Sequence, residues 1–217
     1  MKLRAVYEKG DRVRFLGHLD VARCIQLSIF RAKWPVEMSQ GFSPRPKISV
    51  YAPLPVGVSG EEEYFDAVLG GCPDLALLAR TLSAALPEGF VLHEVYPAPL
   101  REEPFEESIK ASSYSVDVKG VKPDRVKKAL DEFRDASQVL FEVERPKGSR
   151  VYDLRPFVRS MGEPFEAEGN RVVLDMEIAH EKGRTVRPQW VLSSLSRYGL
   201  DLDAREAIFN RRKIIFG

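Results

Sequence analysis

The stretch Ser39-Gln-Gly-Phe-Ser-Pro-Arg-Pro-Lys47 separates a long amphipathic segment from a short apolar one, and the order of the surrounding elements follows from it. Gly41 has no Cβ, so the chain can adopt a positive φ there and turn. Pro44 and Pro46 fix their own φ and bias the residues before them toward extended geometry. We therefore expect a stiffened loop that joins a helix to a strand.

This loop is predicted to present cationic and aromatic side chains. Side chains alternate in an extended segment, so Arg45 and Lys47 project on the same side. One interpretation is a strand-entry loop with ordinary solvated charges. The sharper interpretation is contact with a nucleic acid or another anionic partner, because a rigid loop loses little entropy on binding. The residues that would make this contact are Gln40, Gly41, Phe42, Ser43, Arg45 and Lys47.

The first half of the chain, residues 1–98, is predicted to fold as one ferredoxin-like βαββαβ domain. Its helices show apolar residues at spacings of three and four, and its strands are bounded by Gly and Pro. The expected elements are strands at 2–9 and 12–15 joined as a hairpin, a helix at 16–33, strands at 47–52 and 62–69, a helix at 75–86 and a strand at 90–96.

The proline-rich, acidic segment 97–107 indicates a domain boundary. Residues 108–217 are predicted to repeat the plan, which gives an α+β protein of two tandem ferredoxin-like units, each with helices packed on one face of an antiparallel sheet. The expected elements are strands at 114–118 and 139–144 around a helix at 122–136, an insertion at about 145–170 with a short helix near 154–161, a strand at 171–179, a helix at 188–198 and a strand at 208–215.

Composition describes an ordinary globular protein. The chain has 217 residues, 44% of them hydrophobic and 30% charged, with a net charge of +1. It contains no apolar run long enough to cross a membrane and no secretory signal, so we expect a cytoplasmic protein. Cys24 and Cys72 stand alone, without further Cys or His at metal-ligand spacing, so no metal site and no cofactor are predicted. Buried thiols are favoured over a single disulfide.

Positive charge is concentrated in the second half. Residues 1–108 carry 12 Lys or Arg and 15 Asp or Glu, whereas residues 109–217 carry 21 and 17. Arginine beside aromatic residues suits RNA phosphates and stacked bases, although Glu144 and Asp153 dilute one of the basic groups. The candidate RNA contacts here are Arg145, Lys147, Arg150, Arg155, Arg159, Arg211, Arg212 and Lys213.

The start of the first helix carries candidate catalytic residues. His18 could act as a general base on Ser39 or Ser43, with Asp20 beside it, or both His18 and Asp20 could serve in helix capping and packing. The sequence contains no HExxH, GxSxG, Walker loop or GxGxxG, so the fingerprints of common hydrolases, NTPases and dinucleotide enzymes are missing.

Three motifs in the first half resemble the radical SAM-linked family of domains of unknown function: Phe15-Leu-Gly-His-Leu-Asp20, Ser39–Lys47 and Pro53-Leu-Pro-Val-Gly57. That bacterial domain is fused to, or encoded beside, cobalamin-binding radical SAM proteins. This chain has no CxxxCxxC motif, so it resembles the accessory portion standing alone. The resemblance implies a link to RNA metabolism and a radical SAM partner, and it supplies no catalytic residues.

Together these features favour a non-catalytic accessory protein that binds tRNA, rRNA or an RNA-containing substrate and works with a radical SAM enzyme. Two alternatives stay open. One is a metal-independent enzyme that processes or modifies RNA through His18 and a nearby serine. The other is an adaptor that binds only protein, through the loop around Phe42.

Overall fold

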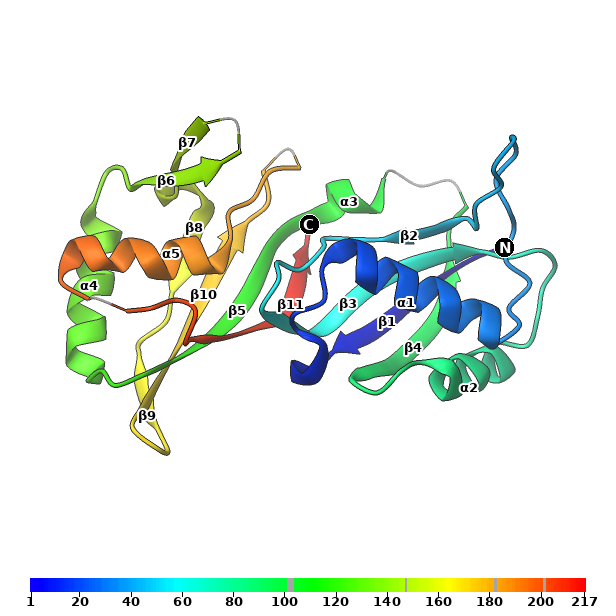
Figure 1. The fold of residues 1–217 in the computed structure, drawn as a ribbon, viewed down its shortest axis with the longest axis horizontal. Coiled ribbons are helices and arrows are strands. Elements are labelled where there is room, and N and C mark those ends of the chain that lie inside the picture. The colour runs from blue at the N-terminus through cyan, green and yellow to red at the C-terminus, as the bar shows by residue number, and fades with distance from the viewer. Residues whose placement is uncertain (101–103, 147, 182, 201) are drawn as a thin grey trace. The chain divides into compact units, whose positions relative to one another are not determined.

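The computed structural model describes residues 1–217 except 101–103, 147, 182 and 201 (Figure 1). The chain divides into two compact units, Met1–Ser108 and Ile109–Gly217. Each is a mixed α/β unit in which antiparallel strands are accompanied by helices. Among the described residues, no helix is both long enough and apolar enough to cross a bilayer.

The first unit contains a sheet with the strand order β4-β1-β3-β2, in which all neighbours are antiparallel. The central strands are β1 and β3, and β2 pairs with β3 on the side away from β1. The elements are β1 (Lys2–Lys9), the 3-10 helix η1 (Asp11–Val13), α1 (His18–Arg31), β2 (Ile48–Val50), β3 (Val58–Val68), α2 (Leu75–Ala85), β4 (Phe90–Ala98) and α3 (Phe105–Ser108).

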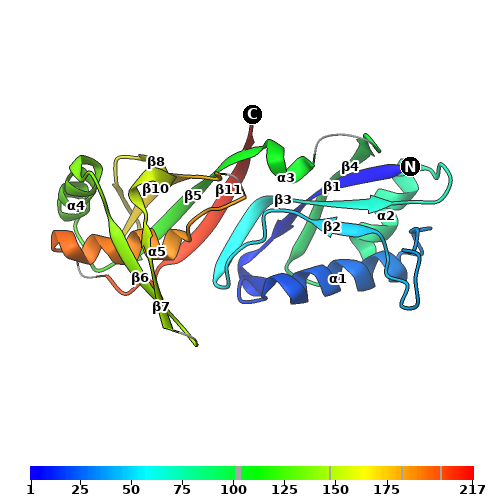
Figure 2. The same cartoon turned by 90° about the horizontal axis from the view of Figure 1, so that it is seen from above.

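One hydrophobic core joins the sheet to helices α1 and α2 (Figure 2). Alternate residues of β1 enter it, because side chains along a strand point to opposite faces. Residues of α1 at helical spacing meet them, and Trp34 beyond the end of α1 donates its indole N–H to the carbonyl of Leu78 at 3.1 Å. The core includes Leu3, Ala5, Tyr7, Ile25, Ile29, Phe65, Leu78 and Leu82.

The opposite face of this sheet carries a buried polar cluster. Arg4 donates two hydrogen bonds to the carboxylate of Asp66, at 2.8 and 2.9 Å, and the Tyr51 hydroxyl donates to the same carboxylate at 2.8 Å. The Phe105 ring lies 3.3 Å from the Arg4 guanidinium carbon and 4.9 Å from the Tyr51 ring. Because Phe105 covers this cluster, the first unit extends to Ser108, ten residues beyond the predicted end of the first domain.

The second unit has a main sheet with the order β11-β5-β10-β8, and the short strand β9 also pairs with β10. Its core brings α4 and α5 against this sheet through residues such as Val126, Leu130, Val191 and Leu174. The elements are β5 (Ile109–Lys119), α4 (Pro123–Asp135), β6 (Leu140–Arg145), β7 (Gly148–Asp153), η2 (Arg155–Phe157), β8 (Val158–Met161), β9 (Phe165–Ala167), β10 (Arg171–Ala179), α5 (Pro188–Ser194), η3 (Leu195–Tyr198) and β11 (Ile208–Phe216).

The insertion differs from its prediction. The expected helix near 154–161 is a single 3-10 turn followed by strand β8, which pairs with β10 at Met161↔Met176. The expected sheet strand at 139–144 is β6, which pairs with β7 in a separate two-stranded hairpin. Alternating apolar residues identified a strand there, but they could not identify its partner, which is set by long-range packing.

Two further predictions about the first unit are wrong. Residues 12–15 do not form a hairpin strand with β1, because β3 and β4 already occupy both edges of β1. The chain instead makes η1, and the Gly10 N–H donates to the carbonyl of Gly89 at 2.8 Å. Both cysteines are free thiols, as expected, but Cys72 is exposed rather than buried.

Candidate functional site

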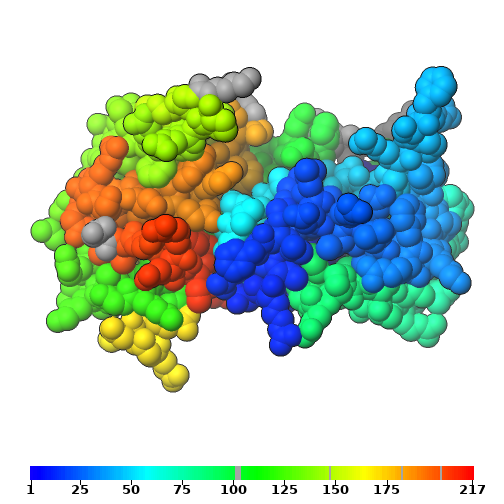
Figure 3. All heavy atoms as spheres, viewed as in Figure 1, coloured from blue at the N-terminus to red at the C-terminus, as the bar shows by residue number. Residues whose placement is uncertain are grey.

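The segment between α1 and β2 forms a narrow arm that projects from the first unit (Figures 1 and 3). Its neck is closed by two hydrogen bonds across the loop: the Ser39 N–H donates to the Arg45 carbonyl at 2.7 Å, and the Arg45 N–H donates to Ser39 Oγ at 2.9 Å. Gly41 turns the tip with a φ of 135°, a conformation that disfavours other residues. The Phe42 side chain is fully exposed, so nothing in the unit's own core holds it.

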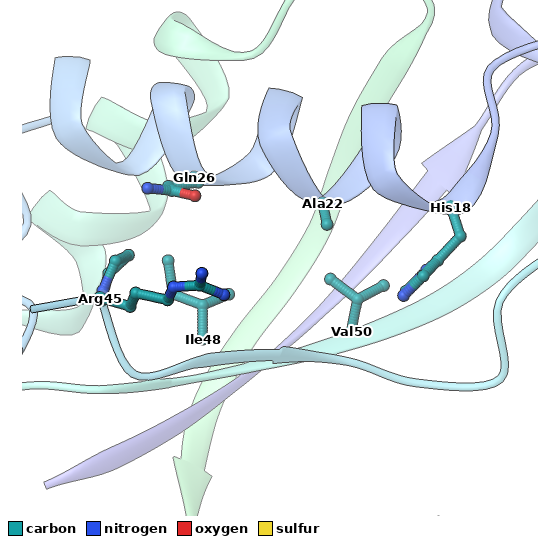
Figure 4. Close-up of a pocket in the computed structure, with 7 residues that line it drawn as sticks. His18, Ala22, Gln26, Arg45, Ile48 and Val50 are labelled. Carbon is teal, nitrogen blue, oxygen red and sulfur yellow. The ribbon is translucent and has the colours of Figure 1, made fainter. Parts of the chain in front are cut away.

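Beside the arm, a groove of about 400 Å³ runs between α1 and β2 (Figure 4). Its α1 wall is a stripe at intervals of four residues, which places these side chains on the same face of the helix. Its β2 side supplies apolar residues, and Arg45 reaches in from the arm. The residues that line the groove are His18, Ala22, Gln26, Arg45, Pro46, Ile48 and Val50.

The groove has two polar regions separated by an apolar floor. His18 lies near one end, and Arg45 lies near Gln26 toward the other, with Val50 between them (Figure 4). The His18 and Arg45 side chains are both exposed. Within the described chain, Arg45 makes no ion pair with a carboxylate, so its positive charge faces the groove without neutralisation.

The start of α1, which carries His18, is held by a buried lysine. Lys9 is 1% exposed, and its ammonium group donates to the carbonyls of Arg14, Leu16 and Val58 at 3.0, 2.9 and 3.2 Å. A buried ammonium group is tolerated only when such partners replace water. Lys9 therefore fixes the turn before α1 against the beginning of β3.

The Pro53–Gly57 motif packs on the same turn. The Gly57 N–H donates to the Arg14 carbonyl at 2.9 Å, and a Cβ placed at Gly57 would lie 3.9 Å from the Phe15 ring. Gly57 itself has a φ of 86°, which the turn requires and which favours glycine. The three motifs that are separated in the sequence thus meet at one end of α1 and along the groove beside it.

The structure does not bring His18 and Ser43 together. Ser43 lies in the exposed arm and is not among the residues that line the groove with His18. Asp20 lies in the first turn of α1, and a Cβ placed at Gly17 would be 3.6 Å from its Oδ2, so the carboxylate folds back toward the start of the helix. That position favours interaction with the positive end of the helix dipole.

Lys47 is predicted as an anion contact, but its ammonium group lies 2.8 Å from Glu37 Oε2. The same contact lowers the pKa of the Glu37 carboxyl, chiefly through the hydrogen bond from Lys47. Both side chains are partly exposed, so the pair is weak and solvent competes with it. Lys47 therefore contributes less positive charge to the arm than the sequence indicates.

The predicted basic group of the second unit separates into two places. Arg155 donates to the carbonyls of Val158 and Arg134 at 3.1 and 3.2 Å, so its guanidinium fixes backbone. Arg159 lies 3.3 Å from Glu177 and lines a small cavity of about 150 Å³ together with Arg155. Both residues make contacts within the unit and Arg159 is exposed, so their role as RNA contacts stays a prediction.

The C-terminal basic group is also divided. Arg211 is 1% exposed, so its prediction as a surface contact is wrong. It lies opposite Tyr114 in the β11–β5 ladder, on a face that is buried. Arg212 and Lys213 follow at a register shift and are exposed. Lys147 lies outside the described residues.

Arg145 and Arg150 lie on the β6–β7 hairpin, and both guanidinium groups lie over the Tyr152 ring. Two residues that the sequence analysis missed belong to this surface: Trp190, which packs against Tyr152 and Phe141, and Arg187, whose guanidinium lies over Trp190. The sequence signal for this contact was the spacing of Arg187 and Trp190, three residues apart at the start of a helix that begins with Pro188. Its hairpin partners are not local in sequence and could not be identified without the fold.

Comparisons with known proteins give little beyond the family. No curated protein matches the chain. A chain in the crystal structure of a Cbf5-Nop10-Gar1 complex is similar in fold, with a TM-score of 0.49 and 13% sequence identity. The match covers 96% of the present chain and 48% of that chain, so the protein spans about half the length of this structural relative.

The sequence profile of one bacterial family matches residues 2–188, which include both walls of the groove, the arm and the β6–β7 hairpin. The family is described as "Uncharacterized protein conserved in bacteria (DUF2344)". The protein belongs to this family.

Proposed function

We propose that this protein binds RNA through the groove between α1 and β2 and the arm beside it. The observation that carries the proposal is the convergence of His18 and Arg45, from motifs separated in the sequence, on one open groove, with the exposed Phe42 on the same arm as Arg45. An arginine guanidinium suits a phosphate, because its planar donors match phosphate oxygens. The exposed Phe42 ring suits a base, since every base offers a flat face for stacking.

The dimensions of the groove fit this use. A cavity of about 400 Å³ lies within the range of roughly 300 to 1,000 Å³ that small-molecule and cofactor sites occupy, so a nucleotide can enter it. Ile48 and Val50 provide an apolar floor for the face of a base or ribose. His18 and Gln26 add hydrogen-bonding groups along the α1 wall, which can act on base edges or on 2′-hydroxyl groups.

We also propose that both units are ferredoxin-like. The strand order β4-β1-β3-β2 of the first unit and the order β11-β5-β10-β8 of the second support this. Each order has a central antiparallel pair, β1-β3 or β5-β10, and each outer strand follows a helix that leads from the non-adjacent strand of that pair. In the second unit, β6 and β7 are then an addition to the plan rather than part of the sheet.

The protein is proposed to act without catalysis of its own and to present RNA to a partner enzyme. The identification of that partner as a radical SAM protein rests on the sequence resemblance alone. The rival, an RNA-processing enzyme that uses His18 with a serine, lacks its second residue in the groove, because Ser43 does not line it.

The test is RNA binding by the full chain, measured by fluorescence anisotropy with a labelled oligouridylate and with bulk bacterial tRNA. Arg45→Glu is expected to weaken binding by about tenfold or more, because it replaces a phosphate contact with a repulsive charge. Binding should also weaken steeply as salt rises. Arg80→Glu is the matched control, since Arg80 is an exposed arginine on α2 that does not line the groove.

Four outcomes would contradict the proposal. Wild-type protein that binds neither RNA would remove it, and so would binding that is insensitive to salt. Equal loss from Arg45→Glu and Arg80→Glu would remove the groove as the site. In the same assay, RNA cleavage that disappears in His18→Ala would replace the accessory role with the enzyme.

A further inference from the structure

The β6–β7 hairpin of the second unit has two chemically different faces. Directly opposed residues of antiparallel strands share a face, and successive residues alternate between faces. The register Phe141↔Tyr152, Val143↔Arg150 and Arg145↔Gly148 places aromatic and basic residues together on one face. The other face carries Leu140, Glu142, Glu144, Ser149, Val151 and Asp153.

Because the two faces are separate, the acidic residues of the hairpin do not neutralise its basic residues, although the linear sequence would suggest that they do. Glu144 is adjacent to Arg145 in the chain, yet the two side chains project from opposite faces of the ribbon. Asp153 is also engaged, since its Oδ1 accepts hydrogen bonds from the backbone N–H groups of Val139 and Arg155 at 2.9 and 3.1 Å. The basic face therefore carries no carboxylate of the hairpin itself.

The aromatic residues of this face rest on helix α5, beside which the hairpin lies (Figures 1 and 2). The Phe141 and Trp190 rings stack with centroids 6.0 Å apart and planes 23° apart, and the Tyr152 and Trp190 centroids are 5.1 Å apart. All three side chains are half-buried. The packing fixes the rings and leaves part of each at the surface.

Three exposed arginines surround these rings. The guanidinium carbons of Arg145 and Arg150 lie 5.9 and 5.0 Å from the Tyr152 centroid, and that of Arg187 lies 5.3 Å from the Trp190 centroid. Arg145 also donates a hydrogen bond to the Tyr152 hydroxyl. In the described part of the chain, none of the three forms an ion pair with a carboxylate. Each guanidinium is thus oriented by an aromatic ring while its charge is not neutralised.

We propose that this arginine–aromatic surface, formed by Phe141, Arg145, Arg150, Tyr152, Arg187 and Trp190, is a second RNA site that binds single-stranded RNA. It rests on the proposed function and adds to it a site that the groove does not include. The three guanidinium groups bind successive phosphates, and an unpaired base stacks on a guanidinium plane that the rings hold in place. Because the rings already orient the arginines, little side-chain entropy is lost when the strand binds.

Single-stranded RNA suits the surface better than a duplex. A base can stack on an aromatic side chain only when its neighbour in the strand does not cover its face, which occurs in loops, bulges and ends. An acidic protein segment would pair with the arginines but would make no use of the rings. The combination of fixed rings and unpaired arginines therefore favours RNA, and the acidic peptide becomes an outcome of the test.

The experiment uses the full chain and an oligouridylate that carries 4-thiouridine for photocrosslinking. The double variant Arg150→Glu/Arg187→Glu is expected to weaken binding by about tenfold or more, whereas Arg150→Lys/Arg187→Lys should lose about threefold, since lysine keeps the charge and loses the planar contact. Arg197→Glu is the control, because Arg197 is exposed on η3 of the same unit and makes no described ring contact. Crosslinked peptides should include Tyr152 or Trp190.

The outcomes separate this inference from the proposed function. If Arg45→Glu weakens binding and the double charge reversal does not, the second site is wrong and the groove stands. If the double reversal weakens binding and Arg45→Glu does not, the groove is wrong as an RNA site and the hairpin site stands. Competition of an oligoglutamate peptide with the RNA at equal efficiency, without crosslinks to the rings, would replace the RNA site with a site for acidic protein segments.

Discussion

The two candidate surfaces present positive charge in different ways. In the first unit, Lys9 is buried as a structural cation, Lys47 is paired with Glu37, and Arg45 is the cation that lines the groove. In the second unit, the basic hairpin face carries its acidic residues on the opposite side. The comparison shows that the number of lysines and arginines in a segment is a poor guide to the charge that it offers a ligand.

The difference also concerns how each surface is fixed. The groove depends on hydrogen bonds to backbone at the start of α1, whereas the hairpin surface depends on stacked rings. The first arrangement is sensitive to removal of a single buried donor. The second shares its energy among several contacts, so single substitutions are expected to have smaller effects on folding.

Replacement of Lys9 should have the largest effect. Lys9→Met removes a buried donor from three carbonyls, of which that of Arg14 keeps its hydrogen bond from the Gly57 N–H, so we expect a loss of about 3 kcal/mol in the free energy of unfolding. Urea unfolding followed by circular dichroism measures it. Lys128→Met, at an exposed lysine of α4, is the control and should change stability by less than about 0.5 kcal/mol. A loss as small as that of the control would show that Lys9 does not hold the groove together.

The second unit contains a histidine whose titration should make the stability of the unit depend on pH. Burial lowers the pKa of His180 to about 4, with Arg211 and Arg159 adding to the effect, and Ser112 Oγ lies 3.0 Å from its Nε2. Since the pKa is depressed in the folded state, the unfolded chain binds the proton first as pH falls. Stability is therefore full above about pH 6.5 and is lost between pH 6.5 and 4, by about 2 kcal/mol after allowance for partial exposure.

Urea unfolding at pH 7.5 and pH 5 measures this loss, and NMR titration of the imidazole gives the pKa directly. His180→Gln removes the titrating group, so the part of the pH dependence assigned to it should disappear. An imidazole that titrates near its ordinary value would show that it is not shielded in solution.

Removal of the Phe42 ring should affect binding without affecting folding. Phe42→Ala is expected to weaken RNA binding by about tenfold through the loss of one stacked base, while the free energy of unfolding stays within about 0.5 kcal/mol because the side chain is fully exposed. Leu19→Ala removes another exposed apolar side chain near the groove and should leave the affinity unchanged. Equal effects of the two substitutions would argue against a stacking role for Phe42.

The smallest effect is expected from the Lys47–Glu37 pair. Lys47→Met should lower RNA affinity by no more than about twofold, because its charge is already paired, whereas Glu37→Gln should raise affinity by about twofold at low salt. Anisotropy titrations at two salt concentrations detect both changes. A loss with Lys47→Met as large as that with Arg45→Glu would mean that the ion pair opens when RNA binds.

Local rules predicted the parts of the molecule that depend on neighbouring residues. Gly41 and the two prolines sufficed to predict an exposed arm, and the helical spacing of Ile25 and Ile29 predicted the buried face of α1. Pairing across the chain was beyond such rules. Strand β8, and not β6, pairs with β10, so β6 pairs with β7 in the hairpin. Nothing in residues 139–145 alone predicts which of the two strands pairs with β10.

Some errors had a signal in the sequence. Phe209 and Arg211 are two residues apart in β11, so they lie on the same face of the strand, and both are buried. This alternation was compatible with a buried arginine. The run Arg211-Arg212-Lys213 nevertheless favoured the prediction of a basic surface. Pro146 and Gly148 marked a turn within the expected insertion. Recognition of that turn would have predicted the hairpin, although not its contact with Trp190, which requires the fold.

The opposed faces of the β6–β7 ribbon have a consequence for how a strand can approach. A two-stranded ribbon is only one backbone thick, so the carboxylates of Glu142 and Glu144 on its reverse lie close enough to repel any phosphate that comes from that side. At the RNA site proposed for this hairpin, these carboxylates would therefore repel a strand that approached the reverse side of the ribbon. Under this proposal, the ribbon restricts the side from which an RNA strand approaches the arginine–aromatic surface.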